Sequence, residues 1–190
     1  MEVDILNFLS KSAQNMKPSP IRALLSVVNQ PGIISFAGGF PNPSTFPIED
    51  LKQIVIDVLE QEGAKSLQYG GTDGNAQLRE EIAKIYIAQG LDIDKDNVII
   101  TTASQQAIDL TSRIFLDPGD TVVCGIPTYL GALQSFNAYR ANIVGAEKDE
   151  ELEAVVSLCR KYNVPLVCDE IHADFVYAPG GHHSIMTIDG

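Results

Sequence analysis

The stretch NVIITTASQQAIDLTSRIFLDPGDTVVCGI, residues 97–126, decides the fold class of this chain. A short β-branched run at 97–101 is followed by a helical pattern at 105–116. The turn 117–120 then leads into a second β-branched run at 121–124. Strands that alternate with helices are typical of a parallel sheet. The stretch therefore predicts an α/β fold, a mostly parallel sheet with flanking helices.

The same alternation continues on both sides of this stretch. Downstream we expect a helix at 129–139, a strand at 141–144, a helix around 152–159 and a buried strand at 164–168. Upstream, apolar spacing predicts helices around 51–59 and 78–86, separated by a glycine-rich loop at 68–74, after a helical segment at 4–30 that is broken at 17–20. We expect an N-terminal helical and extended arm over residues 1–45 and a partial large domain over residues 46–190.

Composition narrows the function classes. With 190 residues, 45% hydrophobic and 20% charged, the chain is expected to fold around a sizeable core. The net charge of −12 disfavours nucleic acid and anionic membranes as partners, and no apolar run approaches membrane-spanning length. Three widely spaced cysteines (Cys124, Cys159 and Cys168) imply buried thiols in a reducing compartment, which favours the cytoplasm.

In a parallel sheet, ligands bind beyond the carboxyl ends of the strands. The loops at those ends are 102–106, 125–130 and 169–173. The search for a functional site therefore starts with these three loops.

Each loop offers one side chain suited to part of a flat, phosphorylated cofactor. Ser104 is placed as a helix N-cap beside N–H groups that could bind phosphate, or it is a plain cap. Tyr129 could stack on a ring or simply pack at a helix start. Asp169 could pair with a protonated ring nitrogen or cap the next turn. Each signal alone is weak, but three at consecutive strand ends indicate one site.

Ordered motifs then point to a family. They are PSPIR at 18–22, SFAGGFPNP at 35–43, LQY at 67–69, SQQ at 104–106 and PTYLGALQS at 127–135. With these motifs the chain resembles the fold-type I aminotransferases that depend on pyridoxal 5'-phosphate (PLP). Over about residues 15–145 it is most similar to the α-aminoadipate/kynurenine aminotransferase group.

The resemblance implies a function and a set of roles. Such enzymes move an amino group between a 2-amino acid and a 2-oxo acid, and they form homodimers. The cofactor-binding residues that it implies are Ala103, Ser104 and Gln105 at the phosphate, Tyr129 on the ring, Asp169 at the ring nitrogen, and Tyr69 at the phosphate of the partner subunit. It also places Arg22, Gly38 and Gly39 near the substrate carboxylate.

The last part of the chain resembles a different branch of the same superfamily. Residues 169–177 (DEIHADFVY) and 182–184 (HHS) are similar to the cystathionine β-lyases. His172 stands where the aminotransferases place a tyrosine against the phenolic oxygen of the cofactor. A C–S lyase is therefore one alternative function. The absence of the Schiff-base lysine, described below, makes a non-catalytic α/β scaffold the other. Cys168, His172, His182 and His183 match no common zinc spacing, so no metal is expected.

The resemblance also shows what the sequence lacks. Family members carry another strand where this chain has only residues 145–151. Beyond the aspartate that matches Asp169 they carry two more strands and the Schiff-base lysine beside a serine. None of the eight lysines of this chain stands in that context. The catalytic residue is therefore unknown, and the substrate cannot be derived beyond its class.

Overall fold

The computed structural model describes residues 5–16, 32–34, 39–147, 152–177 and 184–189. The chain forms two compact units. One unit is Pro18–Thr72, and the other joins Met1–Lys17 to Asp73–Gly190. The expected boundary between an arm and a domain at residue 45 stays a prediction.

The described residues of the unit Pro18–Thr72 contain one long helix. The short 3-10 helix η2 (Pro43–Thr45) is capped by the side chain of Asn42, whose Oδ1 accepts from the Ser44 N–H at 3.1 Å. Helix α3 (Ile48–Ser66) confirms the helix expected around 51–59. Gly63 interrupts it with a φ of 46°, which glycine adopts without steric cost.

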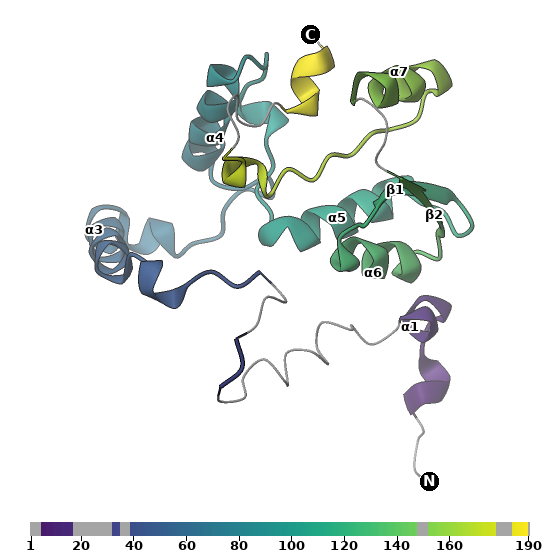
Figure 1. Cartoon of the computed structure of the whole chain (residues 1–190). Helices are drawn as coiled ribbons and strands as arrows, with labels where there is room; N and C mark the ends of the chain where they lie inside the picture. The colour runs from purple at the N-terminus through teal and green to yellow at the C-terminus, as the bar shows by residue number, and fades with distance from the viewer. Residues whose placement is uncertain (1–4, 17–31, 35–38, 148–151, 178–183, 190) are drawn as a thin grey trace. The chain divides into compact units, whose positions relative to one another are not determined.

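The other unit contains the α/β elements (Figure 1). They confirm the helices expected around 78–86, 105–116, 129–139 and 152–159 and two of the predicted strands. Of the helical segment expected at 4–30, residues 17–30 lie outside the described residues. In chain order they are η1 (Ile5–Phe8), α1 (Lys11–Asn15), α4 (Ala76–Ala88), η3 (Lys95–Asn97), α5 (Ala103–Phe115), β1 (Thr121–Ile126), α6 (Leu130–Ala138), β2 (Asn142–Glu147), α7 (Leu152–Tyr162), η4 (Ala173–Phe175) and η5 (Ile185–Asp189).

The sheet of the described residues is a parallel pair. β1 and β2 run in register from Thr121 opposite Asn142 to Ile126 opposite Glu147. Helix α6 makes the connection between them and packs against both α5 and β2 (Figure 1). The α/β class with a parallel sheet is therefore confirmed, and α5 and α6 begin at two of the three loops where the site was expected.

Two expected strands are absent. The strands expected at 97–101 and 164–168 do not form, although both runs are rich in β-branched or apolar residues. Asn97 ends η3, and residues 98–101 and 164–168 belong to no helix or strand. Val164, Leu166 and Val167 are 53%, 43% and 62% exposed, so the expected buried strand is also wrong about burial. The physical reason is that a strand needs a neighbour to satisfy its backbone groups, and neither segment pairs with another described segment.

The core of the described residues is small. Its buried apolar side chains are Ala83, Leu91, Ala132, Val156 and Ile185. The expectation of buried thiols is wrong for Cys168, which is exposed, while Cys124 and Cys159 are half-buried. No described helix is both long enough and apolar enough to cross a membrane.

A buried arginine holds one of the two unpaired segments. Arg79 of α4 is 6% exposed and forms ion pairs with Asp73 and, at 2.8 Å, with Asp96. Its Nε donates to the Lys95 carbonyl at 3.0 Å. The Asp73 carbonyl accepts from the N–H of Ile100 at 3.0 Å. Residues 98–101 are therefore fixed by this loop and not by a sheet.

Candidate cofactor site

The first turn of α5 is open at its N-terminus. Thr102 is the N-cap residue and its side chain makes no cap hydrogen bond. Ser104 is the second helical residue, so the expectation that Ser104 is the N-cap is wrong. Asn75, by contrast, caps α4 by accepting from the N–H groups of Gln77 and Leu78. The first-turn N–H groups of a helix have no acceptor within the helix, and at α5 no side-chain cap takes them up.

The backbone at this turn adopts an unusual conformation. Ala103 has a φ of 60°, in the left-handed region that residues other than glycine seldom occupy. The Thr101 Oγ1 donates to the Ala103 carbonyl at 3.1 Å, and the Gln106 side chain accepts from the Thr102 N–H. These two hydrogen bonds hold the turn. Left-handed backbone conformations of residues other than glycine concentrate at functional sites.

Gln105 and Tyr129 meet at the start of α6. The Gln105 Nε2 donates to the Gly131 carbonyl and to the Ser135 Oγ, both at 3.1 Å. A Cβ added at Gly131 would overlap the Gln105 Oε1 and the ring of Tyr129. The structure therefore brings two of the expected site residues together. Because the side-chain N–H groups of Gln105 are used here, its backbone N–H is the group left for a phosphate.

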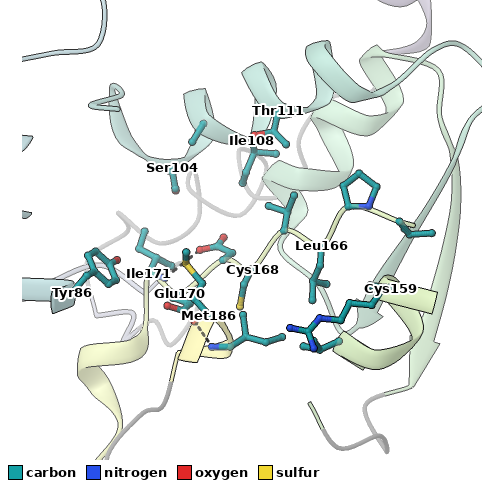
Figure 2. Close-up of a pocket in the computed structure, with 18 of the residues that line it drawn as sticks. Tyr86, Ser104, Ile108, Thr111, Cys159, Leu166, Cys168, Glu170, Ile171 and Met186 are labelled. Carbon is teal, nitrogen blue, oxygen red and sulfur yellow. Dashed lines mark hydrogen bonds between the residues drawn. The ribbon is translucent and has the colours of Figure 1, made fainter. Parts of the chain in front are cut away.

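Ser104 and Asp169 line one cavity of about 890 Å³. Ser104, Ile108 and Thr111 of α5 lie on one side of it, and Cys168, Glu170, Ile171 and Met186 lie across from them (Figure 2). Oδ1 of Asp169 accepts from the Ile171 N–H at 3.2 Å. The cavity has the size of a small-molecule pocket. Two of the three side chains that the sequence indicates for one site line it, although the strands expected before them do not form.

Two carboxylates affect the protonation of Cys168, on the side of the cavity opposite α5. Partial desolvation raises the pKa of the Cys168 thiol, and the carboxylates of Glu170 and Asp169 raise it further. Glu170 itself accepts from the Ile185 N–H at 3.1 Å, which joins the wall to η5. Cys168 is therefore a protonated thiol at neutral pH.

Lysine is absent from this wall. Of the eight lysines, Lys17 and Lys148 lie outside the described residues, and none of the other six lines the cavity.

Known proteins match this chain along most of its length. The family model described as "Aminotransferase class I and II" matches residues 33–150 and 146–189. The chain belongs to the class I and II aminotransferase family. The chain is 42% identical, over 78% of its own length and 36% of the relative's, to "Aromatic-amino-acid aminotransferase 1" of Thermococcus litoralis. It is 38% identical, over 74% of its length and 34% of the relative's, to "2-aminoadipate transaminase" of Thermus thermophilus.

A solved aminotransferase gives the same result in three dimensions. The kynurenine aminotransferase of Pyrococcus horikoshii, whose crystal structure is described as a complex with PMP, superposes with a TM-score of 0.71 at 40% identity. The match covers 84% of this chain and 40% of that chain. The expected likeness to the aminoadipate and kynurenine enzymes is thereby confirmed.

The match is partial in two respects. The chain spans about a third of the length of the two curated relatives named above. The family model matches in two pieces that overlap at residues 146–150, within the segment where the sequence analysis expects a family strand to be missing. Both pieces match the same aminotransferase family, so the tail at 146–189 lies within it, and the relatives named above do not favour the lyase alternative.

Other expected residues of this aminotransferase-family chain lie elsewhere or outside the description. His172 precedes η4, and its ring lies 6.0 Å from that of Phe175; it is not among the cavity residues. Tyr69 and Gly39 belong to the unit Pro18–Thr72 and are exposed. Arg22, Gly38, His182 and His183 lie outside the described residues. No group of three or more possible metal ligands occurs among the described residues.

The sequence interpretation missed Ser135 and Glu170. Ser135 is 5% exposed and accepts from Gln105. Its spacing of four residues from Gly131 places both on one face of α6, and this spacing could have found it. Glu170 follows Asp169 directly, and nothing in the sequence distinguishes its contact with η5.

The first turn of α5 and Asp169, which line the same cavity, fit the phosphate and the ring nitrogen of PLP. Tyr129 is not among the residues that line this cavity and lies beside Gln105 at the start of α6. The cavity is large enough for the cofactor, and the turn of α5 presents donors that anions favour.

Proposed function

We propose that this chain is the PLP-binding core of an aminotransferase that moves an amino group between a 2-amino acid and a 2-oxo acid. The observation that carries the proposal is the shared cavity of Ser104 and Asp169. It brings a helix N-terminus and a carboxylate, which suit opposite ends of the cofactor, to one site. Family membership and the PMP-bound relative support the choice of cofactor.

Each residue would act through an elementary interaction. The N–H groups of Ser104 and Gln105 would donate to the cofactor phosphate, aided by the positive end of the α5 dipole. Tyr129 would cover one face of the ring. The Asp169 carboxylate would keep the ring nitrogen protonated. Bound PLP supplies an electron sink for the substrate carbanion.

Amino-group transfer also needs a group that moves the substrate proton, and no described lysine lines the cavity. We therefore separate cofactor binding, which the described residues support, from turnover. Turnover requires a lysine at the cofactor. A homodimer in which Tyr69 reaches the partner's cofactor, and a place in the cytoplasm, remain part of this proposal.

The test is an absorbance titration of the chain with PLP, before and after borohydride reduction, with mass spectrometry to map the adduct. A saturable spectral change that Asp169→Ala weakens would support a specific site. Adduct on a single lysine would identify a lysine that can serve the chemistry. Diffuse labelling of many lysines without saturation would contradict the proposal.

The oligomeric part has its own test. Light scattering of the chain with and without PLP should give twice the monomer mass of 20.6 kDa if the dimer forms. A monomer at all concentrations would remove the role assigned to Tyr69.

A further inference from the structure

We infer that Ser135 and Gly131 are positioning residues that hold the Gln105 amide and, through it, set the ring of Tyr129 for the cofactor. The inference rests on the proposed function. It adds two residues of α6 that do not touch the proposed cofactor themselves.

The first step is the hydrogen bonding of Gln105. Its side chain leaves α5 and crosses to α6, where both bonds of Nε2 end on one turn of that helix, at the Gly131 carbonyl and the Ser135 Oγ. Ser135 is 5% exposed, so water cannot easily replace it. Two bonds from one amide group fix its plane as well as its position.

The second step is the space above Gly131. A side chain there would overlap both the Gln105 Oε1 and the ring carbons of Tyr129. The amide and the ring therefore lie against the same glycine. Gly131 is needed here because the two groups occupy the place of a Cβ.

The third step is the freedom of Tyr129. It is the residue just before α6, makes no side-chain cap bond and is 49% exposed. A half-exposed ring at a helix start has several rotamers available. The Gln105 amide restricts the Tyr129 ring on one side. If the amide loses its hydrogen bond to Ser135, the ring can adopt a wider range of orientations.

One side chain thereby connects the two ends of the proposed site. Gln105 belongs to the first turn of α5, where the phosphate would bind, and it contacts the start of α6, where the ring would be covered. The Gln105 amide therefore links these two helix starts, and the Ser135 hydroxyl is one of its two anchors on α6.

The test measures binding of pyridoxamine 5'-phosphate to the full 190-residue chain by equilibrium dialysis. This probe has no aldehyde, so it does not react with surface lysines. We expect Ser135→Ala to weaken binding roughly five-fold, the effect of one lost buried hydrogen bond. Gln105→Glu, which keeps the shape but removes both Nε2 donors, should weaken it at least as much.

The matched control is Ser112→Ala. Ser112 is also buried, at 3% exposure, but its hydroxyl donates to the Ile108 carbonyl of its own helix. This variant should bind the probe like the parent chain. Circular dichroism of each variant checks that the fold is kept.

A double-mutant cycle separates positioning from general support. In a Tyr129→Ala background, Ser135→Ala should change binding by less than about two-fold, because the ring that it positions is gone. If Ser135→Ala has its full effect in that background, or none in the parent chain, the inference is overturned. If the parent chain itself does not bind the probe, the proposed function fails and the inference falls with it.

Discussion

β1 and β2 form a ladder of six residue pairs, whereas residues 98–101 and 164–168 do not form strands although their composition is just as suited to a sheet. Helix α6 connects β1 to β2 and allows the two strands to lie side by side. The two other segments meet no strand among the described residues. β-propensity measures how well a residue fits a pleated, half-buried surface. It does not supply the neighbouring strand that makes such a surface.

The two unpaired segments also differ from each other. Residues 98–101 are tied to the Asp73 loop by Ile100 and lead directly into the ordered turn of α5. Residues 164–168 form one wall of the cavity and are held at their start by the Val164 N–H, which donates to the Cys159 carbonyl at 2.9 Å. A single backbone hydrogen bond to a loop or helix can therefore fix one end of a segment without a strand ladder. It does not bury the apolar side chains of that segment.

The largest expected effect is a difference in amide hydrogen exchange between the paired strands and the two unpaired segments. The hydrogen-bonded amides of β1 and β2 should exchange at least about 100-fold more slowly, relative to their intrinsic rates, than those of Ile99, Leu166 and Val167. Amide exchange followed by mass spectrometry or NMR measures this. Equal protection in both regions would mean that the unpaired segments are paired in solution.

Removing the arginine that anchors residues 98–101 should have the next largest effect. Arg79→Leu should lower the free energy of unfolding by about 2 kcal/mol, because two carboxylates lose their shared cation but are themselves half-exposed or more. Urea denaturation measures it. Lys84→Leu is the matched control, since Lys84 also pairs with two carboxylates but on an exposed helix face. An equal loss in both variants would refute the role of burial.

Substitutions at the N-caps of α4 and α5 should change stability by a smaller amount. Asn75→Ala should destabilise the chain by about 1 kcal/mol, because α4 loses its side-chain cap. Thr102→Ala should leave stability nearly unchanged, because the Thr102 side chain makes no cap bond to α5. Thermal unfolding of both variants, with Asn75→Asp as the conservative control, measures the contrast. Equal losses would show that the two ends are capped alike.

The smallest expected effect concerns the reactivity of Cys168, which lines the cavity. Glu170→Gln removes a carboxylate that raises the pKa of Cys168, so its thiolate fraction and its alkylation rate at neutral pH should rise. In the parent chain the alkylation rate of Cys168 should increase with pH, because only the thiolate reacts. Iodoacetamide labelling followed by mass spectrometry measures both, with Cys124 as the internal reference. An unchanged rate for Cys168 would mean that Glu170 does not face the thiol in solution.

Much of the candidate site could be predicted because the sequence signals for it are local. The helix that begins after Thr102, the aromatic at the start of α6 and the aspartate at 169 are each readable from a few neighbouring residues. The sequence places Ser104 two positions too early in its helix, because a serine before an apolar run is also what an N-cap looks like. The bond from Gln105 to Ser135 joins residues thirty positions apart, and no local pattern shows it.

The sequence by itself determined the α/β class, most of the helices, the positions of two strands and, through its ordered motifs, the aminotransferase family. These depend on periodicity, turn residues and short motifs, which act over a few residues. The tertiary structure decided which β-rich runs become strands, that Arg79 holds residues 98–101, and that Ser104 and Asp169 share a cavity. These depend on partners distant in the chain. A hydrogen bond or a buried surface exists only when both of its sides are present.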